Sequence, residues 1–252
     1  MQETNNILES DLLSIDKENV LQAIILAGGL GTRLQSVVTD LPKCLAPVAG
    51  KPFLHYVIQY LQKQGVNKFI FSLGYLSDAI ESFLSENYPL LNYQLSIETT
   101  PLGTGGAIQL ACKKADTENV LVLNGDTIFA VDINALLQLH SNKHAACTLA
   151  LKPMKNFERY GVVTMDENNC IQSFEEKKFY SDGLINGGVY LLNKEKFLSN
   201  NFAEKFSFEK DYLEKMVTDK KFVGLHQDAY FIDIGIPEDF ERAQVEFGDF
   251  LI

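Results

Sequence analysis

Short apolar runs alternate with segments of helical periodicity through the first 150 residues, and this alternation constrains the fold more than any other feature of the sequence. Neighbouring parallel strands must be joined by crossover segments, which are usually helices. The alternation therefore predicts an α/β protein with a mostly parallel sheet covered by helices on both faces. Strands are predicted at 21–26, 68–73, 92–97, 120–123 and 146–151, and helices at 52–64, 77–85, 105–114 and 134–140.

The pattern changes after residue 150. Three strand-like runs at 162–165, 171–174 and 188–192 have short turns between them, which predicts antiparallel additions to the same sheet. Helical periodicity returns at 208–216 and after Pro237. Because no repeat or flexible linker divides the chain, we expect one domain over residues 20–252, preceded by a leader at 1–19. In such a sheet, ligands bind in the crevice beyond the carboxyl ends of the strands.

Acidic residues outnumber basic ones by 33 to 22, which gives a formal net charge of -11. A nucleic-acid-binding domain normally carries the opposite excess, so no nucleic acid partner is expected. Any phosphate site must then be a local cluster of cations. The leader lacks the basic region of a signal peptide, and no apolar stretch approaches the roughly 20 residues that cross a bilayer. We therefore expect a cytoplasmic protein without membrane contacts.

A glycine-rich loop follows the first strand-like run directly, and residues 26–34 of this loop read LAGGLGTRL. It is not a Walker A motif, because no Gly-Lys-Ser/Thr follows, and Leu34 stands where a dinucleotide fingerprint needs its third glycine. Glycines let backbone N–H groups approach an anion, and the planar fork of Arg33 can reach phosphate oxygens. The spacing alone leaves two interpretations open, a phosphate-binding loop and a tight structural turn.

This loop, followed at a suitable distance by Leu41-Pro42-Lys43, resembles the signature of the sugar-phosphate nucleotidyltransferases. The resemblance spans about residues 22–245, and the order of its elements is more specific than any single motif. It implies a Rossmann-like (GT-A-like) fold, Mg²⁺ as cofactor, and transfer of a nucleoside monophosphate from an NTP to a sugar 1-phosphate with release of pyrophosphate. Cys44 departs from the proline expected after Lys43, and the leader has no counterpart in the family core, but neither departure removes a phosphate contact.

The resemblance also implies roles for individual residues. Catalysis would depend on three cations and two carboxylates that also bind the metal, namely Arg33, Lys43, Lys177, Asp126 and Asp233. The nucleotide would be bound by Leu26, Ala27, Gly28, Gly29, Gly31, Thr32, Glu98, Pro101, Gly103 and Thr104. The sugar phosphate would be bound by Asn124, Gly125, Glu176, Lys177, Asn186 and Gly187.

Each of these motifs has a plainer interpretation when it is taken alone. Residues 101–107 form a second glycine loop that could be an ordinary strand-to-helix turn. Asp126 ends an apolar strand, where it could bind Mg²⁺ or simply cap a turn. The charged residues at 175–177 could be solvated, and the glycines after Asn186 could mark a β-bulge. Because Asp126 and Asp233 are far apart in sequence, their convergence is a prediction of the fold.

The identity of the base depends on Glu98, which occupies the family's base-reading position. A carboxylate can accept hydrogen bonds from N1–H and the exocyclic amine of guanine, whereas thymine and uracil suit an amide better. GTP is therefore favoured, although Glu98 could also be a surface strand residue. Residues 33–47, 159–161, the strand around Asn186 (185–190) and residues 231–239 most resemble family members that act on D-glycero-alpha-D-manno-heptose 1-phosphate. Hexose or amino-sugar 1-phosphates with UTP, CTP or dTTP are the alternatives.

The expected reaction is in-line attack by an oxygen of the sugar phosphate on the α-phosphorus of the NTP. A phosphate monoester has its second pKa at about 6, so the nucleophile is already anionic and needs no general base. Catalysis would depend on positioning and charge neutralisation. A non-catalytic sugar-nucleotide-binding regulatory module would be expected to have lost some phosphate or metal residues. A glycosyltransferase commonly carries Asp-x-Asp where this chain has Asn124-Gly125-Asp126. A homo-oligomer is compatible with the sequence.

Overall fold

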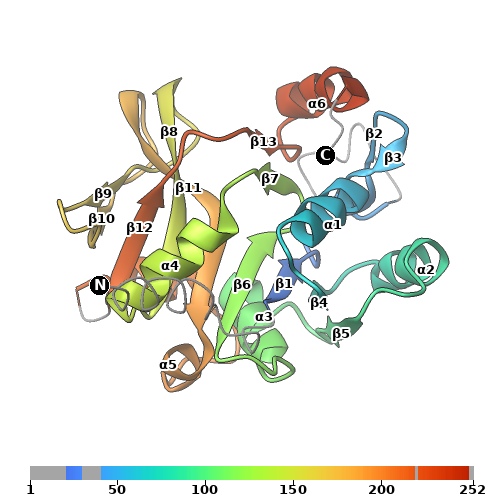
Figure 1. The fold of residues 1–252 in the computed structure, drawn as a ribbon, viewed down its shortest axis with the longest axis horizontal. Helices are drawn as coiled ribbons and strands as arrows, with labels where there is room; N and C mark the ends of the chain where they lie inside the picture. Colours follow the sequence, from blue (N-terminus) through green and yellow to red (C-terminus); the bar gives the residue numbers. More distant parts are fainter. Residues whose placement is uncertain (1–20, 30–40, 219–220, 250–252) are drawn as a thin grey trace, which may run out of the picture.

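The computed structural model describes residues 21–29, 41–218 and 221–249. Its centre is a seven-stranded sheet (Figure 1). From one edge to the other, the strands are β12 (Phe222–His226), β8 (Cys147–Phe157), β11 (Tyr180–Asn193), β6 (Asn119–Asn124), β1 (Gln22–Leu26), β4 (Lys68–Leu73) and β5 (Tyr93–Ile97). Among these strands only β11 pairs antiparallel with its neighbours. The predicted mostly parallel sheet is therefore confirmed.

Successive side chains of the central strands enter two hydrophobic cores on opposite faces of the sheet. Ala23 and Ile25 of β1 belong to one core, whereas Ile24 between them belongs to the other. Leu123 and Val122 of β6 divide in the same way. Side chains alternate along a strand, so a strand that is apolar at every position must be covered on both sides. This explains why the central strands are continuous apolar runs in the sequence.

Helices cover both faces, as the sequence predicts. Side chains of α1 (Phe53–Lys63), α2 (Ser77–Asn87), α4 (Ile133–Lys143) and α6 (Pro237–Asp249) enter the first core. The second core receives side chains of α3 (Gly103–Cys112), α5 (Lys194–Leu198) and the π-helical segment η2 (Phe208–Glu214). Helix α1 begins directly after Pro52 and is followed by Gly65, whose φ of 87° suits the end of a helix.

The hairpin after β8 differs from the prediction. β9 (Val163–Met165) and β10 (Ile171–Phe174) form a separate antiparallel pair instead of joining the main sheet. In the described ranges, two isolated bridges, Val162↔Ile185 and Cys170↔Val223, connect this region to the main sheet. The reason is that β8 already pairs with β11 on one side and β12 on the other, which leaves it no free edge. The antiparallel prediction is correct for β11, which contains residues 188–192.

Two further strand pairs lie outside the main sheet, and one of them brings distant segments together. A hairpin of β2 (Pro47–Val48) and β3 (Lys51–Pro52) follows the 3₁₀ turn η1 (Lys43–Leu45). The second pair joins β7 (Thr127–Phe129), directly after β6, to β13 (Phe231–Asp233). The β7–β13 pair therefore places a C-terminal segment at the carboxyl end of β6.

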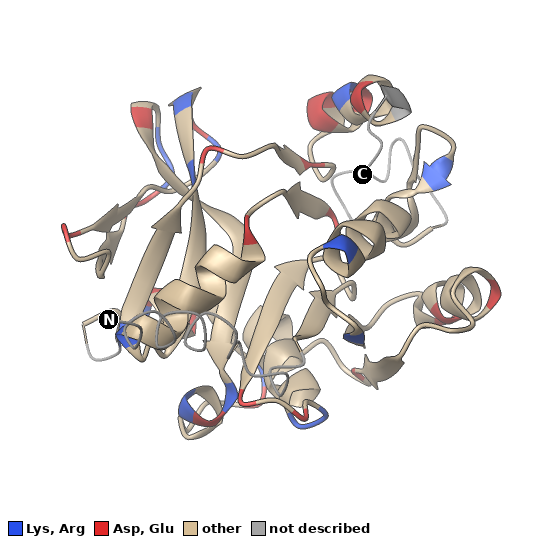
Figure 2. Cartoon of the chain, viewed as in Figure 1, with Lys and Arg blue, Asp and Glu red and all other residues tan. Residues whose placement is uncertain are grey.

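Acidic and basic residues are interspersed along the described part of the chain, as the colouring of the cartoon in Figure 2 shows. No helix in the described ranges is both long and apolar enough to cross a membrane. The predicted leader, residues 1–19, lies outside the described residues.

Candidate active site

The carboxyl ends of three parallel strands meet at one edge of the sheet. Leu26 at the end of β1 lies beside Asn124 at the end of β6, and the N–H of Gly125 donates to the carbonyl of Leu26 at 2.8 Å. The N–H of Ala27 donates to the carbonyl of Ser72 in β4 at 2.9 Å. The predicted residues Leu26, Ala27, Asn124 and Gly125 therefore lie together, where open α/β sheets bind ligands.

Asp126 and Asp233 converge at this edge, as predicted. Asp233 pairs with Thr127 in the β7–β13 ladder, which places it beside the residue that follows Asp126. The N–H of Ile234 also donates to the carbonyl of Asp126 at 3.0 Å. Two carboxylates separated by more than 100 residues are thus held close together by backbone hydrogen bonds.

Lys43 completes this cluster. Its Nζ donates to Oδ2 of Asp126 at 2.6 Å, and the two side chains are 18% and 29% exposed. Gly235 makes the approach of Lys43 sterically allowed, because a Cβ atom there would overlap Lys43 Nζ and lie 2.7 Å from Oδ1 of Asp233. The N–H of Gly235 donates to the same Oδ1 at 2.8 Å. Lys43, Asp126 and Asp233 therefore form a compact cluster of one cation and two anions.

The electrostatics of the cluster favour an additional cation. Burial raises the pKa of the Asp233 carboxyl, and the nearby Asp126 carboxylate raises it further. The Lys43 ammonium acts in the opposite direction without cancelling these effects. Two anions and one ammonium leave this site with excess negative charge.

The start of the first glycine loop, residues 26–29, packs against the end of β4. A Cβ atom on Gly28 would lie 2.8 Å from the nitrogen of Gly74 and 3.1 Å from the carbonyl carbon of Leu73, so the close approach of the two backbones requires glycine at 28. Gly29 has no atom within 4 Å of such a position among the described residues. Gly31, Thr32 and Arg33 lie outside the described residues.

Glu98 follows β5 and lies against the ends of β1 and β4. Its Oε2 accepts a hydrogen bond from the N–H of Leu102 at 3.0 Å. Its Oε1 lies 2.5 Å from the position of a Cβ on Gly74 and 3.3 Å from that of a Cβ on Gly28. The carboxylate therefore lies at the same sheet edge as the first glycine loop, and its position depends on the lack of a side chain at Gly74.

The second glycine loop supports the packing of α3. Gly103, with φ of 73°, would carry its Cβ 2.5 Å from the carbonyl oxygen of Phe206, and the N–H of Gly105 donates to the same oxygen at 3.0 Å. The hydroxyl of Thr104 donates to Glu209 at 2.7 Å and accepts from the N–H of Phe208 at 2.9 Å. The predicted nucleotide-binding role of Pro101, Gly103 and Thr104 remains a prediction beside these structural contacts.

Asn186 lies at an irregularity in β11. The register between β8 and β11 shifts between Asn186 and Tyr190, as expected of a bulge. The Asn186 amide donates to the Tyr190 hydroxyl at 2.8 Å, and its oxygen accepts from the N–H of Gly188 at 3.1 Å. A Cβ on Gly188 would lie 2.7 Å from Nδ2 of Asn124, and one on Gly187 would overlap the ring of Phe129. The bulge therefore brings the region of Asn186 next to Asn124.

Glu176 and Lys177 are held less closely to the carboxylate cluster than Lys43 is. Both are exposed in the connection between β10 and β11. The Glu176 carbonyl accepts a hydrogen bond from the Tyr180 hydroxyl at 3.0 Å. Within the described residues, no hydrogen bond or ion pair joins Lys177 to Lys43, Asp126 or Asp233. Their predicted contact with a sugar phosphate remains a prediction.

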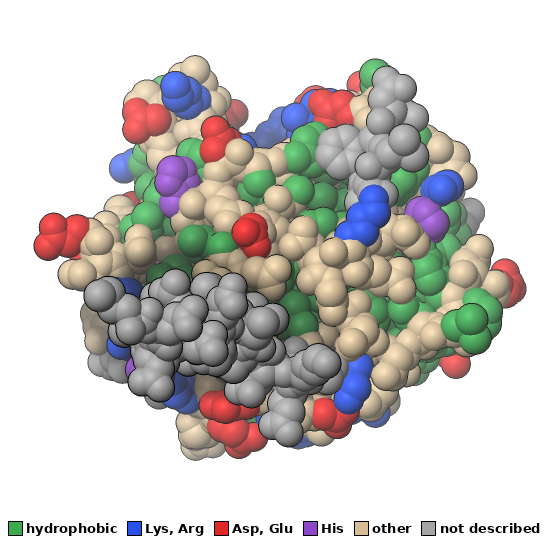
Figure 3. Space-filling view, in the orientation of Figure 1, with side chains coloured by type: hydrophobic (Ala, Val, Ile, Leu, Met, Phe, Trp, Pro, Cys, Tyr) green, Lys and Arg blue, Asp and Glu red, His purple; other side chains and the backbone are tan. Residues whose placement is uncertain are grey.

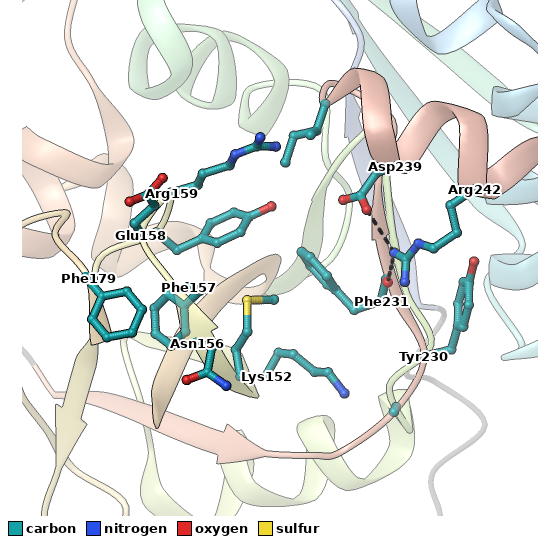
Figure 4. Close-up of a pocket in the computed structure, with 14 residues that line it drawn as sticks. Lys152, Asn156, Phe157, Glu158, Arg159, Phe179, Tyr230, Phe231, Asp239 and Arg242 are labelled. Atoms are coloured by element: carbon teal, nitrogen blue, oxygen red, sulfur yellow. Dashed lines mark hydrogen bonds and ion pairs between the residues drawn. The ribbon is translucent and has the colours of Figure 1, made fainter. Parts of the chain in front are cut away.

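A cavity of about 690 Å³ lies beside the carboxylate cluster, between β8 and the segment from β13 to α6 (Figure 4). It faces the notch at the upper edge of the molecule in Figure 3. None of the predicted site residues that the structure describes lines it. Lys152 lines the cavity and pairs with Ile185, whereas Asn186 pairs with Leu151. Because adjacent residues of a strand point to opposite faces, the side chain of Asn186 points away from this cavity.

Sequence reasoning missed two residues that shape the site. Gly235 admits Lys43 to the carboxylates, and Gly74 makes room for the Glu98 carboxylate. Each glycine follows an apolar strand that ends at the binding edge, β13 for Gly235 and β4 for Gly74. A glycine one or two residues after a buried strand was the available signal, because close approach of a ligand or side chain to the backbone often requires glycine.

The fold and this cluster of charges define an enzyme class. Residues 22–249 match the model of the family described as nucleotidyl transferase, and this chain belongs to that family. It is 51% identical to D-glycero-alpha-D-manno-heptose 1-phosphate guanylyltransferase of Aneurinibacillus thermoaerophilus, over 92% of this chain and 100% of the relative. The protein of the same name from Campylobacter jejuni is 47% identical over 87% of this chain and 97% of the relative.

A solved structure with the same fold is HddC from Yersinia pseudotuberculosis complexed with GMP-PN. It superimposes with a TM-score of 0.81 at 38% sequence identity, and covers 90% of this chain and 99% of the solved chain. The predicted fold and nucleotidyltransferase class are thus confirmed.

Proposed function

We propose that this chain transfers GMP from GTP to D-glycero-alpha-D-manno-heptose 1-phosphate and releases pyrophosphate. The observation that carries the proposal is the cluster of Lys43, Asp126 and Asp233 beside the start of the first glycine loop. The names of two relatives at 51% and 47% identity support the choice of nucleotide and sugar. We further propose a cytoplasmic protein in which residues 20–252 act as one domain, because GTP and sugar phosphates are metabolites of that compartment.

The two carboxylates fit a Mg²⁺ ion. Mg²⁺ takes oxygen ligands and is commonly held by one or two carboxylates together with substrate phosphates. No group of three or more His, Cys, Asp or Glu side chains suited to a metal occurs in the described ranges, so the substrate would supply the remaining ligands. Asp126 and Asp233 would hold the ion. The bound ion would neutralise part of the negative charge of the phosphates. The raised pKa of Asp233 beside Asp126 indicates that this pair favours a bound cation.

The chain's own cations would allow two anionic substrates to meet. Lys43 lies where it can exchange its contact with Asp126 for a phosphate oxygen. Arg33 would bind the triphosphate through its planar fork, and Lys177 would bind the sugar phosphate. The attacking oxygen already carries negative charge near neutral pH. These residues therefore need to position and neutralise the reactants, and they need not remove a proton.

Glu98 would select the base. One of its oxygens already accepts the N–H of Leu102, but each carboxylate oxygen has two lone pairs, so both remain able to accept from guanine. The hydrogen bond from Leu102 fixes the orientation of the carboxylate before the nucleotide binds. The guanine nucleotide in the complex of HddC supports guanine as the base.

Two substitutions test the assignment of the base. We expect Glu98→Gln to lower kcat/KM for GTP by about 10- to 100-fold, since a hydrogen bond to a charged group contributes about 1.5–3 kcal/mol. Gly74→Ala should have a similar effect with Glu98 intact, because its Cβ would lie 2.5 Å from Oε1. Steady-state kinetics with GTP, CTP, UTP and dTTP would measure the preference. An unchanged preference in both variants would contradict the role of Glu98.

The proposed reaction is tested by pyrophosphate release from a matrix of nucleotides and sugar phosphates. We expect GTP with the heptose 1-phosphate to exceed every other combination of GTP, UTP, CTP or dTTP with heptose, mannose or glucose 1-phosphate. Higher activity with mannose 1-phosphate would retain the guanylyltransferase and reject the heptose assignment. Release of a nucleoside diphosphate instead of pyrophosphate would indicate a glycosyltransferase. Binding of GDP-sugars without any turnover would indicate a regulatory module.

A further inference from the structure

The loop between β8 and β9 contacts the segment that carries Asp233 at two points. The two terminal guanidinium nitrogens of Arg159, Nη1 and Nη2, donate to the carboxylate of Glu238 at 3.1 Å and 3.2 Å. The ring of the adjacent Tyr160 packs edge-on against Phe231, with centroids 6.2 Å apart. Phe231 precedes Asp233 by two residues and Glu238 follows it by five. The loop therefore holds the Asp233 segment on both sides of the carboxylate.

The segment that carries Asp233 is also stabilised by contacts within itself. Arg242 in α6 donates to the carbonyl of Phe231 at 3.1 Å and pairs with Asp239 at 3.2 Å (Figure 4). The first turn of α6 is thereby tied back to β13. A displacement of Glu238 would consequently move the whole segment, including Asp233.

The same loop is joined to the segment that leads to Lys177. The carbonyl of Val162 accepts the N–H of Glu175 at 2.7 Å. A Cβ atom on Gly161 would overlap the carbonyl oxygen of Glu175, so the two backbones lie in direct contact. Lys177 lies two residues further along the chain. Residues 159–162 thus connect the carboxylate cluster to the loop proposed to bind the sugar phosphate.

The ion pair at this junction is poorly suited to stabilising the fold. The side chains of Arg159 and Glu238 are 53% and 70% exposed. Exposed ion pairs contribute little to global stability because solvent screens them. However, a two-point contact between a guanidinium and a carboxylate fixes relative orientation in a way that a single contact does not. The geometry is therefore better suited to positioning than to stability.

We propose that Arg159 is a positioning residue for the nucleotidyl transfer: its paired contact with Glu238 sets the Asp233 segment in register with the loop that carries Lys177. Arg159 acts through Glu238 and does not contact a reactant. The proposal rests on the proposed function for its kinetic consequence, but its structural consequence is independent of substrate. Small misplacements of catalytic groups lower the rate strongly, so a modest shift of Asp233 suffices.

The kinetic test uses four variants of the full chain. We expect Arg159→Ala and Glu238→Gln to lower kcat for pyrophosphate release about tenfold, with KM for GTP within twofold and Tm within about 2 °C of wild type. The exchanged pair Arg159→Glu/Glu238→Arg should recover at least half of the loss. Arg159→Lys should recover less, because an ammonium is a point charge and not a fork. The control is Lys68→Ala, which removes a comparable ion pair at the amino end of β4.

A second measurement does not need turnover. Hydrogen exchange of the backbone amides of Ile234, Gly235 and Glu175 should accelerate at least threefold in Arg159→Ala, but not in Lys68→Ala. Their hydrogen bonds to Asp126, Asp233 and Val162 report the position of the two segments. Unchanged exchange, or a kcat within twofold of wild type, would overturn the positioning role. Absence of pyrophosphate release by wild type would overturn the proposed function instead, and the exchange result would still decide the role of Arg159.

Discussion

Replacing Asp126 with Asn is expected to lower kcat for pyrophosphate release about a thousandfold while leaving the fold intact. Asn keeps an oxygen that can accept the hydrogen bond from Lys43, which is 2.6 Å from Asp126 Oδ2. It removes the negative charge with which the proposed Mg²⁺ site binds its ion. Metal ions supply several kcal/mol of charge stabilisation in the transition state, and each 1.36 kcal/mol corresponds to a factor of about ten in rate.

The matched control is Asp116→Asn, because Asp116 is an exposed acid that pairs with Lys68 far from this edge. Turnover of the control should remain near wild type, and the far-ultraviolet circular dichroism of both variants should be unchanged. Raising the Mg²⁺ concentration should recover little activity in Asp126→Asn. Pyrophosphate release within a few-fold of wild type would show that Asp126 does not have the assigned role. Arg33→Ala, at a position outside the described residues, is expected to cause a comparable loss.

The fold was largely predictable from the sequence because its strands are buried on both faces. Residues 68–73 were predicted as a strand from a continuous apolar run, and β4 has the same bounds. Pro52 and Gly65 marked the ends of α1 correctly because each restricts or permits specific backbone angles. Such signals are local, so they can be read without knowing which segments are neighbours in space.

The errors concern long-range pairing. Residues 162–165 and 171–174 were correctly identified as strands, but nothing local shows that β12 occupies the edge of β8 that they would need. Residues 208–216 are helical as predicted, and the structure adds that the backbone is π-helical over Phe208–Glu214, where it packs against α3. Tertiary pairing decided the position of the hairpin.

The site residues also divide into those that local signals could identify and those that depend on long-range contacts. Asp126 could be identified because it ends an apolar strand, and family resemblance supplied Asp233. Their proximity depends on the β7–β13 ladder, whose strands are about a hundred residues apart in the chain. The contacts of Gly74 with Glu98 and of Gly235 with Lys43 depend on backbones meeting across the sheet edge. Motif spacing carries no information about such contacts.

Replacing Asp233 with Asn should abolish turnover as well, but it should make the protein more stable at neutral pH. Burial and the neighbouring Asp126 raise the folded-state pKa of this carboxyl above its ordinary value. The folded state therefore binds the proton more tightly than the unfolded chain, and folding loses free energy as the pH rises from the unfolded to the folded pKa. Above the folded pKa the full cost is present, and below the unfolded pKa the cost disappears.

Thermal unfolding with and without Mg²⁺ measures both consequences. In EDTA at pH 7, Asp233→Asn should have a higher Tm than wild type, since each kcal/mol corresponds to roughly 2–4 °C in a domain of this size. The difference should shrink towards pH 4, as the wild-type carboxyl takes up its proton. Mg²⁺ with GTP should raise the Tm of wild type, because ligands that bind only the folded state stabilise it. The same addition should raise the Tm of the variant much less. A lower Tm at pH 7 in the variant would contradict the electrostatic account. If Mg²⁺ with GTP raised the Tm of the variant as much as that of wild type, Asp233 would not be a ligand of the metal.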